Sequence, residues 1–479
     1  MKQWLAIHLP RLSLESLAAG QDSPLAVSEY RAGRQQIIIC NQAATLAGVS
    51  PGMPAAVAPA LSLSLRILPR EPGKERAALE GVAVWASRFT SHVALAPPHG
   101  LLLELAGSRR LFGGFRVLLP SLQRGLGELG YGFHMALAPT PEAALLLARS
   151  GRRRWVTDLA GLRRVLGPLP LALLPLPSGR LDDLQGLGLR SLDDLLALPP
   201  AGLRRRIGSE FMDWLERLLG RAPDPRPRFQ LPDCFQRRIE LPAEVCCRQA
   251  LLFPARRLLL ELSGFLTAHQ AGTQRLAWTL GQGAAGERCF HLGLLVLERD
   301  PDRLLELLRE RLERVELSAP VREIALEVRD LQPLAGRPLA LFAEVEGVDA
   351  ELGLLERLRM RLGVDAVSGL QVAPDHRPER AWRWADPGSG VTAMTEIERW
   401  RERPLWLLPE PRQLRMQNGH PWLDGRLELG VERERIESGW WDERPVARDY
   451  FMARTASGRR LWVYQELHGE RGWFLHGYF

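Results

Sequence analysis

The sequence predicts a multidomain α+β protein, and three observations support this prediction. Short apolar runs alternate with helical patterns over residues 1–165, as expected where strands pack against helices in one domain. A second alternation, in the order β-α-β-β-α-β, is expected over residues 235–335. Between the two regions, residues 221–228 are rich in proline and arginine, a composition typical of a linker between domains.

The first region is expected to form a sheet covered by helices. Buried strands are predicted where apolar residues run together, at residues 4–7, 37–40, 101–105 and 133–138. Helices are predicted over residues 75–89 and 141–148. The second helix follows a Pro-Thr-Pro sequence, and proline suits the first turn of a helix.

Residues 166–230 are expected to contain a helix-hairpin-helix. Gly186 and Gly188 flank a leucine in the predicted turn, and Ser191 is expected to cap the second helix. Asp194 stands three residues after Ser191, which is the spacing of a capping box. Such a turn lets backbone N–H groups and a helix N-terminus approach a phosphate.

This hairpin supplies the candidate DNA contacts. They are Gly186, Gly188 and Arg190 in the turn, and Arg204, Arg205 and Arg206 one helix later. A purely structural αα-hairpin also needs glycine in its turn, so that alternative stays open.

The remaining elements are expected in two groups. Between residues 235 and 335, strands are predicted at 236–241, 275–281, 287–295 and 322–330, with helices at 249–270 and 301–314. Further on, a helix is predicted at 352–363 and aromatic strands at 450–453, 461–464 and 473–476. In the first group, Arg237, Arg238, Arg256, Arg257 and Arg275 are candidates to follow a DNA backbone.

Composition limits the functional classes. The 479 residues carry a net charge of +7, almost entirely through arginine, because lysine occurs only at Lys2 and Lys74. A basic balance favours a nucleic-acid partner over an acidic small molecule. The five cysteines show no CxxC spacing, so neither a disulfide framework nor a zinc site is predicted. No apolar run is long enough to cross a membrane, and a cytoplasmic, nucleoid-associated location is expected.

Three segments carry a resemblance to a known family. They are residues 4–12, residues 48–54 and residues 103–113. In this order they resemble the palm and fingers of Y-family translesion DNA polymerases, and most of all the inactive ImuB branch, whose members are subunits of bacterial mutagenic repair complexes. The resemblance is ordered along roughly the first 345 residues.

The resemblance implies a domain plan. It assigns a palm with fingers to residues 1–165, with the fingers at about 25–75, and a thumb with its linker to 166–230. A little finger is implied at 235–335, a clamp-binding linker at 336–345 and a partner-interaction region at 346–479.

The resemblance also identifies where catalytic groups belong. Nucleotidyl transfer requires two divalent metals bridged by carboxylates. At the matching positions this chain has His8, Pro10, His99 and Gly100, and these residues are poor Mg²⁺ ligands or offer none. An inactive homologue without a metal or cofactor is therefore implied. The alternative is an active translesion polymerase with rearranged metal ligands.

The nucleotide-binding positions of the family are replaced as well. The fingers' Asn-Tyr-x-x-Arg reads as residues 41–45, Asn-Gln-Ala-Ala-Thr, and two palm lysines read as Pro141 and Leu145. The aromatic ring and the cations that would grip a triphosphate are missing from these positions.

A short segment after the second β-rich region resembles a sliding-clamp motif. Clamp motifs resemble Gln-x-x-Leu-Phe, and this chain reads Pro338, Leu339, Ala340, Leu341 and Phe342. Leu341 and Phe342 match, whereas Pro338 replaces the glutamine. The alternative is an extra strand that buries Leu339 and Leu341.

The implied partners follow from the resemblance. They are primer-template DNA bound without regard to sequence, the sliding clamp, a RecA-like accessory subunit and an error-prone replicative-type DNA polymerase. A DNA-binding repair factor unrelated to clamps is a further alternative. The Asp375–Trp382 segment resembles a stretch of ImuB tails, and a structural hydrogen-bond network is expected there rather than a metal site.

Overall fold

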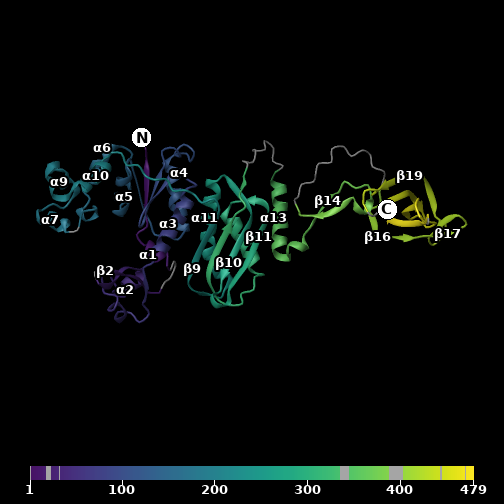
Figure 1. Ribbon diagram of the computed structural model, residues 1–479, viewed down its shortest axis with the longest axis horizontal. Helices are drawn as coiled ribbons and strands as arrows, with labels where there is room; N and C mark the ends of the chain where they lie inside the picture. Colours follow the sequence, from purple (N-terminus) through teal and green to yellow (C-terminus); the bar gives the residue numbers. More distant parts are fainter. Residues whose placement is uncertain are drawn as a thin grey trace. The chain divides into compact units, whose positions relative to one another are not determined.

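The computed structural model describes residues 2–17, 23–31, 33–177, 179–334, 345–387, 403–442, 445–469 and 471–479. The chain divides into two compact units, residues 1–343 and residues 344–479 (Figure 1). The first unit mixes helices with sheets, and the second is rich in strands. The predicted α+β class with a β-containing C-terminal region is therefore confirmed.

A five-stranded sheet lies at the centre of the first region, and we call it the first sheet. Its order is β5 (Val93–Ala96), β6 (Gly100–Glu104), β1 (Trp4–His8), β7 (His134–Ala138) and β8 (Arg154–Trp155). Neighbouring strands are antiparallel except β7 and β8, which are parallel. Strand β8 forms one edge of the sheet.

Alternate residues of β1 enter two different cores, because successive side chains of a strand point to opposite faces. Leu5 and Ile7 pack with α3 (Pro72–Ala86) and α4 (Phe115–Glu128). Trp4 and Ala6 pack with α5 (Pro141–Arg149) on the other face. Helices therefore cover the first sheet on both sides.

A small three-stranded sheet forms from residues between β1 and α3. Its order is β3 (Arg34–Cys40), β2 (Leu25–Arg31) and β4 (Arg66–Pro69). Two short helices, α1 (Leu12–Glu15) and α2 (Gln42–Leu46), precede and follow its first two strands. The sequence patterns predicted β3 but neither β2 nor β4.

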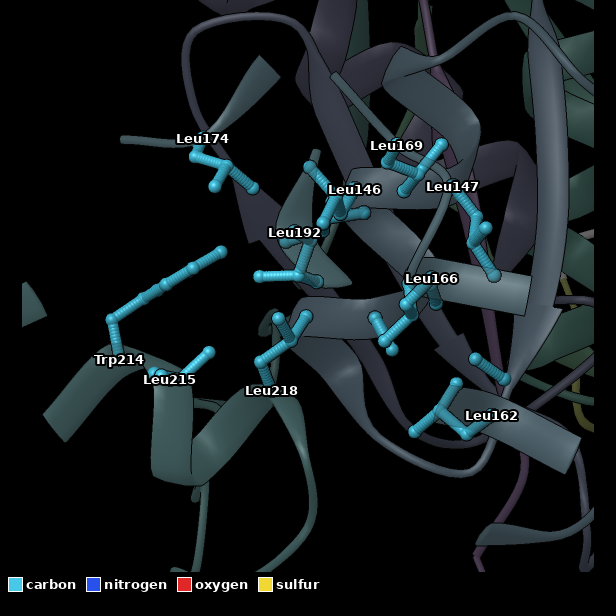
Figure 2. Close-up of a cluster of buried hydrophobic side chains, with 14 of the residues drawn as sticks. Leu146, Leu147, Leu162, Leu166, Leu169, Leu174, Leu192, Trp214, Leu215 and Leu218 are labelled. Atoms are coloured by element: carbon cyan, nitrogen blue, oxygen red, sulfur yellow. The ribbon is translucent and has the colours of Figure 1, made fainter. Parts of the chain in front are cut away.

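Five helices follow the first sheet. They are α6 (Leu159–Leu166), α7 (Arg180–Gly186), α8 (Leu192–Leu196), α9 (Pro200–Ile207) and α10 (Ser209–Leu218). Their leucines pack in one cluster with Leu146 and Leu147 of α5, as Figure 2 shows. The predicted capping box is confirmed, because Ser191 and Asp194 each bond the other's backbone N–H.

The second sheet contains four long antiparallel strands. Its order is β11 (Glu287–Glu298), β10 (Ala271–Gly281), β12 (Val321–Val328) and β9 (Phe235–Val245), with the short β13 (Gln332–Pro333) paired to β10. Helices α11 (Leu252–Ala268) and α12 (Pro301–Leu312) complete the order β-α-β-β-α-β. This order is the one that the sequence predicted.

Helix α11 packs directly against α3, and two glycines allow this close approach. A Cβ atom on Gly264 would lie 2.5 Å from Cα of Trp85, and one on Gly81 would lie 2.6 Å from Oε2 of Glu261. Leu260 of α11 belongs to the core cluster that also contains α3. The first and second sheets are therefore joined through a tightly packed helix pair.

The second unit begins with α13 (Val345–Leu362) and contains two small hairpins and a larger sheet. The hairpins are β14 (Gly369–Val372) with β15 (Trp382–Ala385), and β17 (Arg415–Gln417) with β18 (His420–Trp422). The larger sheet has the order β16 (Trp406–Gln413), β22 (Trp473–Tyr478), β21 (Arg460–Glu466), β20 (Val446–Arg454) and β19 (Glu428–Ser438). Among the described residues, no helix is long and apolar enough to cross a membrane.

Aromatic side chains form part of the core of this larger sheet. Tyr450 and Trp462 stack with ring centroids 4.1 Å apart, and Tyr464 lies against Tyr450 at 5.0 Å. All three rings are buried. These three aromatic residues therefore form part of the core and are not available to stack on nucleic-acid bases.

Candidate functional site

Three histidines lie close together at the end of β1. His8 ends β1, and its Cα is paired with that of Gly100 on one side and that of His134 on the other. The His8 ring centroid lies 6.4 Å from that of His99 and 6.3 Å from that of His134. The resemblance singled out His8 and His99 but not His134.

Burial keeps His8 and His99 uncharged at neutral pH. Burial, together with the positive charge of Arg149 and the two neighbouring histidines, lowers the pKa of His8 to about 4. The pKa of His99 is also lowered, mainly by burial. Neither ring therefore offers a positive charge to a phosphate at physiological pH.

The carboxylate of Glu75 lies next to this cluster but is already engaged. Arg70 donates two hydrogen bonds to it, at 2.8 and 2.7 Å, and Nε2 of His99 lies 3.8 Å away. Burial would raise the pKa of Glu75, but the bonds from Arg70 and Ser13 outweigh burial and lower it. No sequence pattern indicates this role, since Glu75 is only the first residue of a predicted helix.

Two other acids near the cluster have structural partners. Glu15 accepts hydrogen bonds from the backbone N–H of Gly132, and burial raises its pKa. Glu104 accepts from the backbone N–H groups of Gln3 and Ala106. Each of these carboxylates therefore satisfies backbone N–H groups that are partly buried.

These side chains do not match the donors that two Mg²⁺ ions require. Mg²⁺ prefers carboxylate oxygens in octahedral geometry, whereas this site offers neutral imidazoles and one carboxylate already bound to Arg70. In the described part of the chain, no group of three or more His, Cys, Asp or Glu side chains is arranged to hold a metal ion.

The turn of the helix-hairpin-helix is exposed, but its backbone donors are occupied. Gly188 has a φ of +85°, a conformation that suits glycine. The N–H groups of Arg190 and Ser191 both donate to Oδ2 of Asp194, and that of Gly188 donates to the Gln185 carbonyl. The expected approach of these N–H groups to a phosphate is therefore not supported unless Asp194 is displaced.

The arginine side chains of this region differ from its backbone N–H groups, which are already hydrogen-bonded. Arg190, Arg204, Arg205 and Arg206 are all exposed. Within the residues that the structure describes, no carboxylate forms an ion pair with them. A phosphate would therefore meet these guanidinium groups rather than the hairpin backbone.

Most of the candidate arginines around the second sheet are paired with acids. Arg237 and Arg257 both contact the buried Glu261, at 2.9 and 3.6 Å. Arg238 pairs with Glu323 and Arg256 pairs with Asp302. A role in following DNA is not supported for Arg237 and Arg257, because the buried carboxylate of Glu261 already neutralises their charges.

The proposed clamp segment falls largely outside the described residues. Pro338, Leu339, Ala340, Leu341 and Phe342 all lie in the gap between residues 334 and 345. Neither the clamp motif nor the alternative strand is therefore tested.

The Asp375–Trp382 segment forms the hydrogen-bond network that the sequence predicted. Arg377 is buried and pairs with Asp375 at 2.8 Å and with Asp442 at 2.7 Å. Glu379 pairs with Arg448 at 2.9 Å. These contacts attach the segment to the larger sheet of the second unit.

The sequence of this chain is similar to those of known proteins. Residues 12–149 match the model of the impB/mucB/samB family, so this part of the chain is an impB/mucB/samB domain. The chain is also a homologue of Protein ImuB from Caulobacter vibrioides. In each of two strains, that protein is 27% identical over 460 residues, covering 90% of this chain and 100% of the relative. The predicted resemblance to the ImuB branch is confirmed.

Solved structures of DNA polymerases are similar at lower identity. DinB from Sulfolobus solfataricus is 16% identical with a TM-score of 0.39, over 70% of this chain and 100% of that chain. The insertion ternary complex of Dbh DNA polymerase gives the same identity and TM-score, over 69% and 99% of the two chains.

Proposed function

We propose that this chain is a non-catalytic scaffold that binds primer-template DNA and the sliding clamp, and holds a separate error-prone polymerase at damaged sites. In this proposal residues 1–165 act as palm with fingers, 166–230 as thumb, 235–335 as little finger and 336–345 as the clamp tether. The remaining residues, 346–479, dock a RecA-like accessory subunit and the error-prone polymerase.

One observation carries the proposal. At the ends of neighbouring strands, where the family would bind metals, His8 and His99 lie together as neutral imidazoles, and Pro10 and Gly100 offer no ligand. Two-metal catalysis depends on charged oxygen ligands that hold two metal ions, and these ions stabilise both the attacking and the leaving oxygen. Losing these ligands together with the triphosphate contacts favours a scaffold over an enzyme.

A scaffold can promote mutagenesis by concentrating another enzyme at the primer end. Joining two binding modules through a short linker produces an effective concentration near the millimolar scale, so a weak clamp motif suffices. Leu341 and Phe342 are the expected anchors, because apolar side chains seated in a pocket usually dominate such interfaces.

The experiment is clamp binding by the full-length chain with Leu341→Ala and Phe342→Ala. We expect clamp binding and damage-induced mutagenesis to be lost, while DNA affinity and the circular dichroism spectrum stay unchanged. A variant with Leu111→Ala and Phe253→Ala is the matched control, since it removes one leucine and one phenylalanine that are both exposed.

Two outcomes would contradict the tether. If the double variant unfolds, the segment is a core strand instead. If it folds and still binds the clamp as the control does, the clamp site lies elsewhere in the chain.

A further inference from the structure

Three arginines from two elements line one small cavity at the edge of the first sheet. Arg154 begins the edge strand β8, Arg152 precedes it by two residues, and Arg164 lies in the last turn of α6. Together with Ser150 they surround a cavity of about 220 Å³. None of these residues belongs to the DNA contacts considered above.

The positive charge in this cavity has no counter-charge. Of the described residues that line it, none is acidic. The three guanidinium groups form no ion pair or hydrogen bond with any other described residue. This contrasts with the second sheet, where Arg237, Arg238 and Arg256 each contact a carboxylate.

The walls of the cavity are fixed by the protein core. Leu147 and Leu169 line it and are both buried in the cluster that Figure 2 shows. The hydroxyl of Ser150 donates to the Leu147 carbonyl at 2.6 Å and accepts from the backbone N–H of Arg152 at 3.4 Å. The backbone that carries Arg152 is therefore anchored to α5.

We propose that this cavity binds a backbone phosphate of DNA. The edge of β8 would then be a second DNA contact, in addition to the one proposed for Arg204–Arg206. The inference rests on the proposed DNA-binding function. Guanidinium groups match phosphate oxygens in charge and geometry. Three of them converge here without a competing carboxylate, and exposed Arg153 and Arg163 add further positive charge nearby in the sequence.

A phosphodiester suits this cavity better than a free phosphate does. All three lining arginines are exposed, so water competes strongly for a single small anion. A polyanion overcomes this competition because each bound phosphate also releases condensed counterions. The competing explanation is that the arginines only protect an edge strand from pairing with other chains.

The test is DNA binding by the full-length chain with Arg152→Gln, Arg154→Gln and Arg164→Gln. Fluorescence anisotropy with a labelled primer-template duplex is measured from 50 to 200 mM salt. The cavity binds one backbone phosphate, so loss of this contact should reduce the slope of log K against log salt by about 0.9. The affinity advantage of the wild-type chain over the variant should then shrink by roughly 3.5-fold between 50 and 200 mM salt.

A matched control removes the same charge elsewhere. Arg31→Gln, Arg76→Gln and Arg322→Gln change the net charge equally, but each of these arginines pairs with a carboxylate and none is a candidate DNA contact. The control should keep the wild-type slope, because it removes no phosphate contact. The cavity variant should also bind a labelled deoxynucleoside triphosphate no more weakly than wild type does.

The outcomes separate this inference from the proposed function. If the wild-type chain binds no DNA, the proposed function fails. If it binds DNA and the cavity variant matches the control variant, the cavity is not a DNA contact and the arginines protect the edge. If the cavity variant loses triphosphate binding and keeps DNA binding, the site serves a free phosphate and the inference is overturned.

Discussion

Replacing Glu261 by glutamine should loosen the packing between α11 and α3. Glu261 is a buried carboxylate, with only 2% of its side chain exposed, and it contacts Arg237 and Arg257. Arg237 also donates to the Ala77 carbonyl of α3 at 2.7 Å, and Arg257 lies 4.2 Å from the ring centroid of Tyr131. The substitution keeps the shape but leaves two guanidinium groups without their counter-charge.

The expected loss follows from the burial of this cluster. Removing one partner of a buried ion pair costs about 3–5 kcal/mol, whereas a surface pair contributes about 0–1 kcal/mol. Since about 1.4 kcal/mol is a factor of ten, the opening equilibrium of the helix pair should rise by roughly 100-fold to 4000-fold. Glu244→Gln is the control, because Glu244 is 50% exposed and pairs with the exposed Arg322.

Hydrogen exchange of the full-length chain measures this opening. Protection of the α11 amides should fall by about two orders of magnitude or more in Glu261→Gln, and protection of α3 should fall with it. Protection should stay near wild type in Glu244→Gln. If both variants exchange alike, or if α11 loses protection while α3 does not, the ion cluster does not couple the two helices.

The remaining predictions concern the same unit. Gly264→Ala should separate α11 from α3, because its Cβ would lie 2.5 Å from backbone of Trp85; a thermal midpoint equal to wild type would contradict this. The pKa of folded His8 is about 4, and that of an unfolded histidine is about 6.5. Between about pH 4 and pH 6.5 the unfolded state therefore binds more protons than the folded state does. The free energy of unfolding should therefore fall as pH drops through this window, and His8→Gln should reduce the fall in urea titrations at pH 7 and pH 4.5. Reversing charge at Arg204, Arg205 and Arg206 should weaken DNA binding and its salt dependence; unchanged affinity would remove the thumb as a docking surface.

Local patterns were sufficient to predict much of the fold. The β-α-β-β-α-β order and the capping box of Ser191 with Asp194 depend on residues close in sequence, so their signals survive in a single chain. The strands β2 and β4 were missed, since their parallel pairing joins segments about forty residues apart.

The candidate contacts were harder to predict, because they also depend on residues far apart in the sequence. The sequence showed arginine pairs around the second sheet but not their acidic partners, such as Glu261 for Arg237 or Asp302 for Arg256, which lie 24 and 46 residues away. The capping box was predicted, but not that Asp194 would occupy the N–H of Arg190. Only the folded chain shows which charges remain uncompensated.

Primer extension by the purified full-length chain tests the central claim most directly. The reaction contains a primed template, all four deoxynucleoside triphosphates and either Mg²⁺ or Mn²⁺, with a known active polymerase in parallel to prove the substrate. We predict no extension with either metal, because in the proposed match to polymerases His8, Pro10, His99 and Gly100 replace the carboxylate ligands. Metal-dependent extension that His8→Ala abolishes would contradict the account and identify an active polymerase with rearranged ligands.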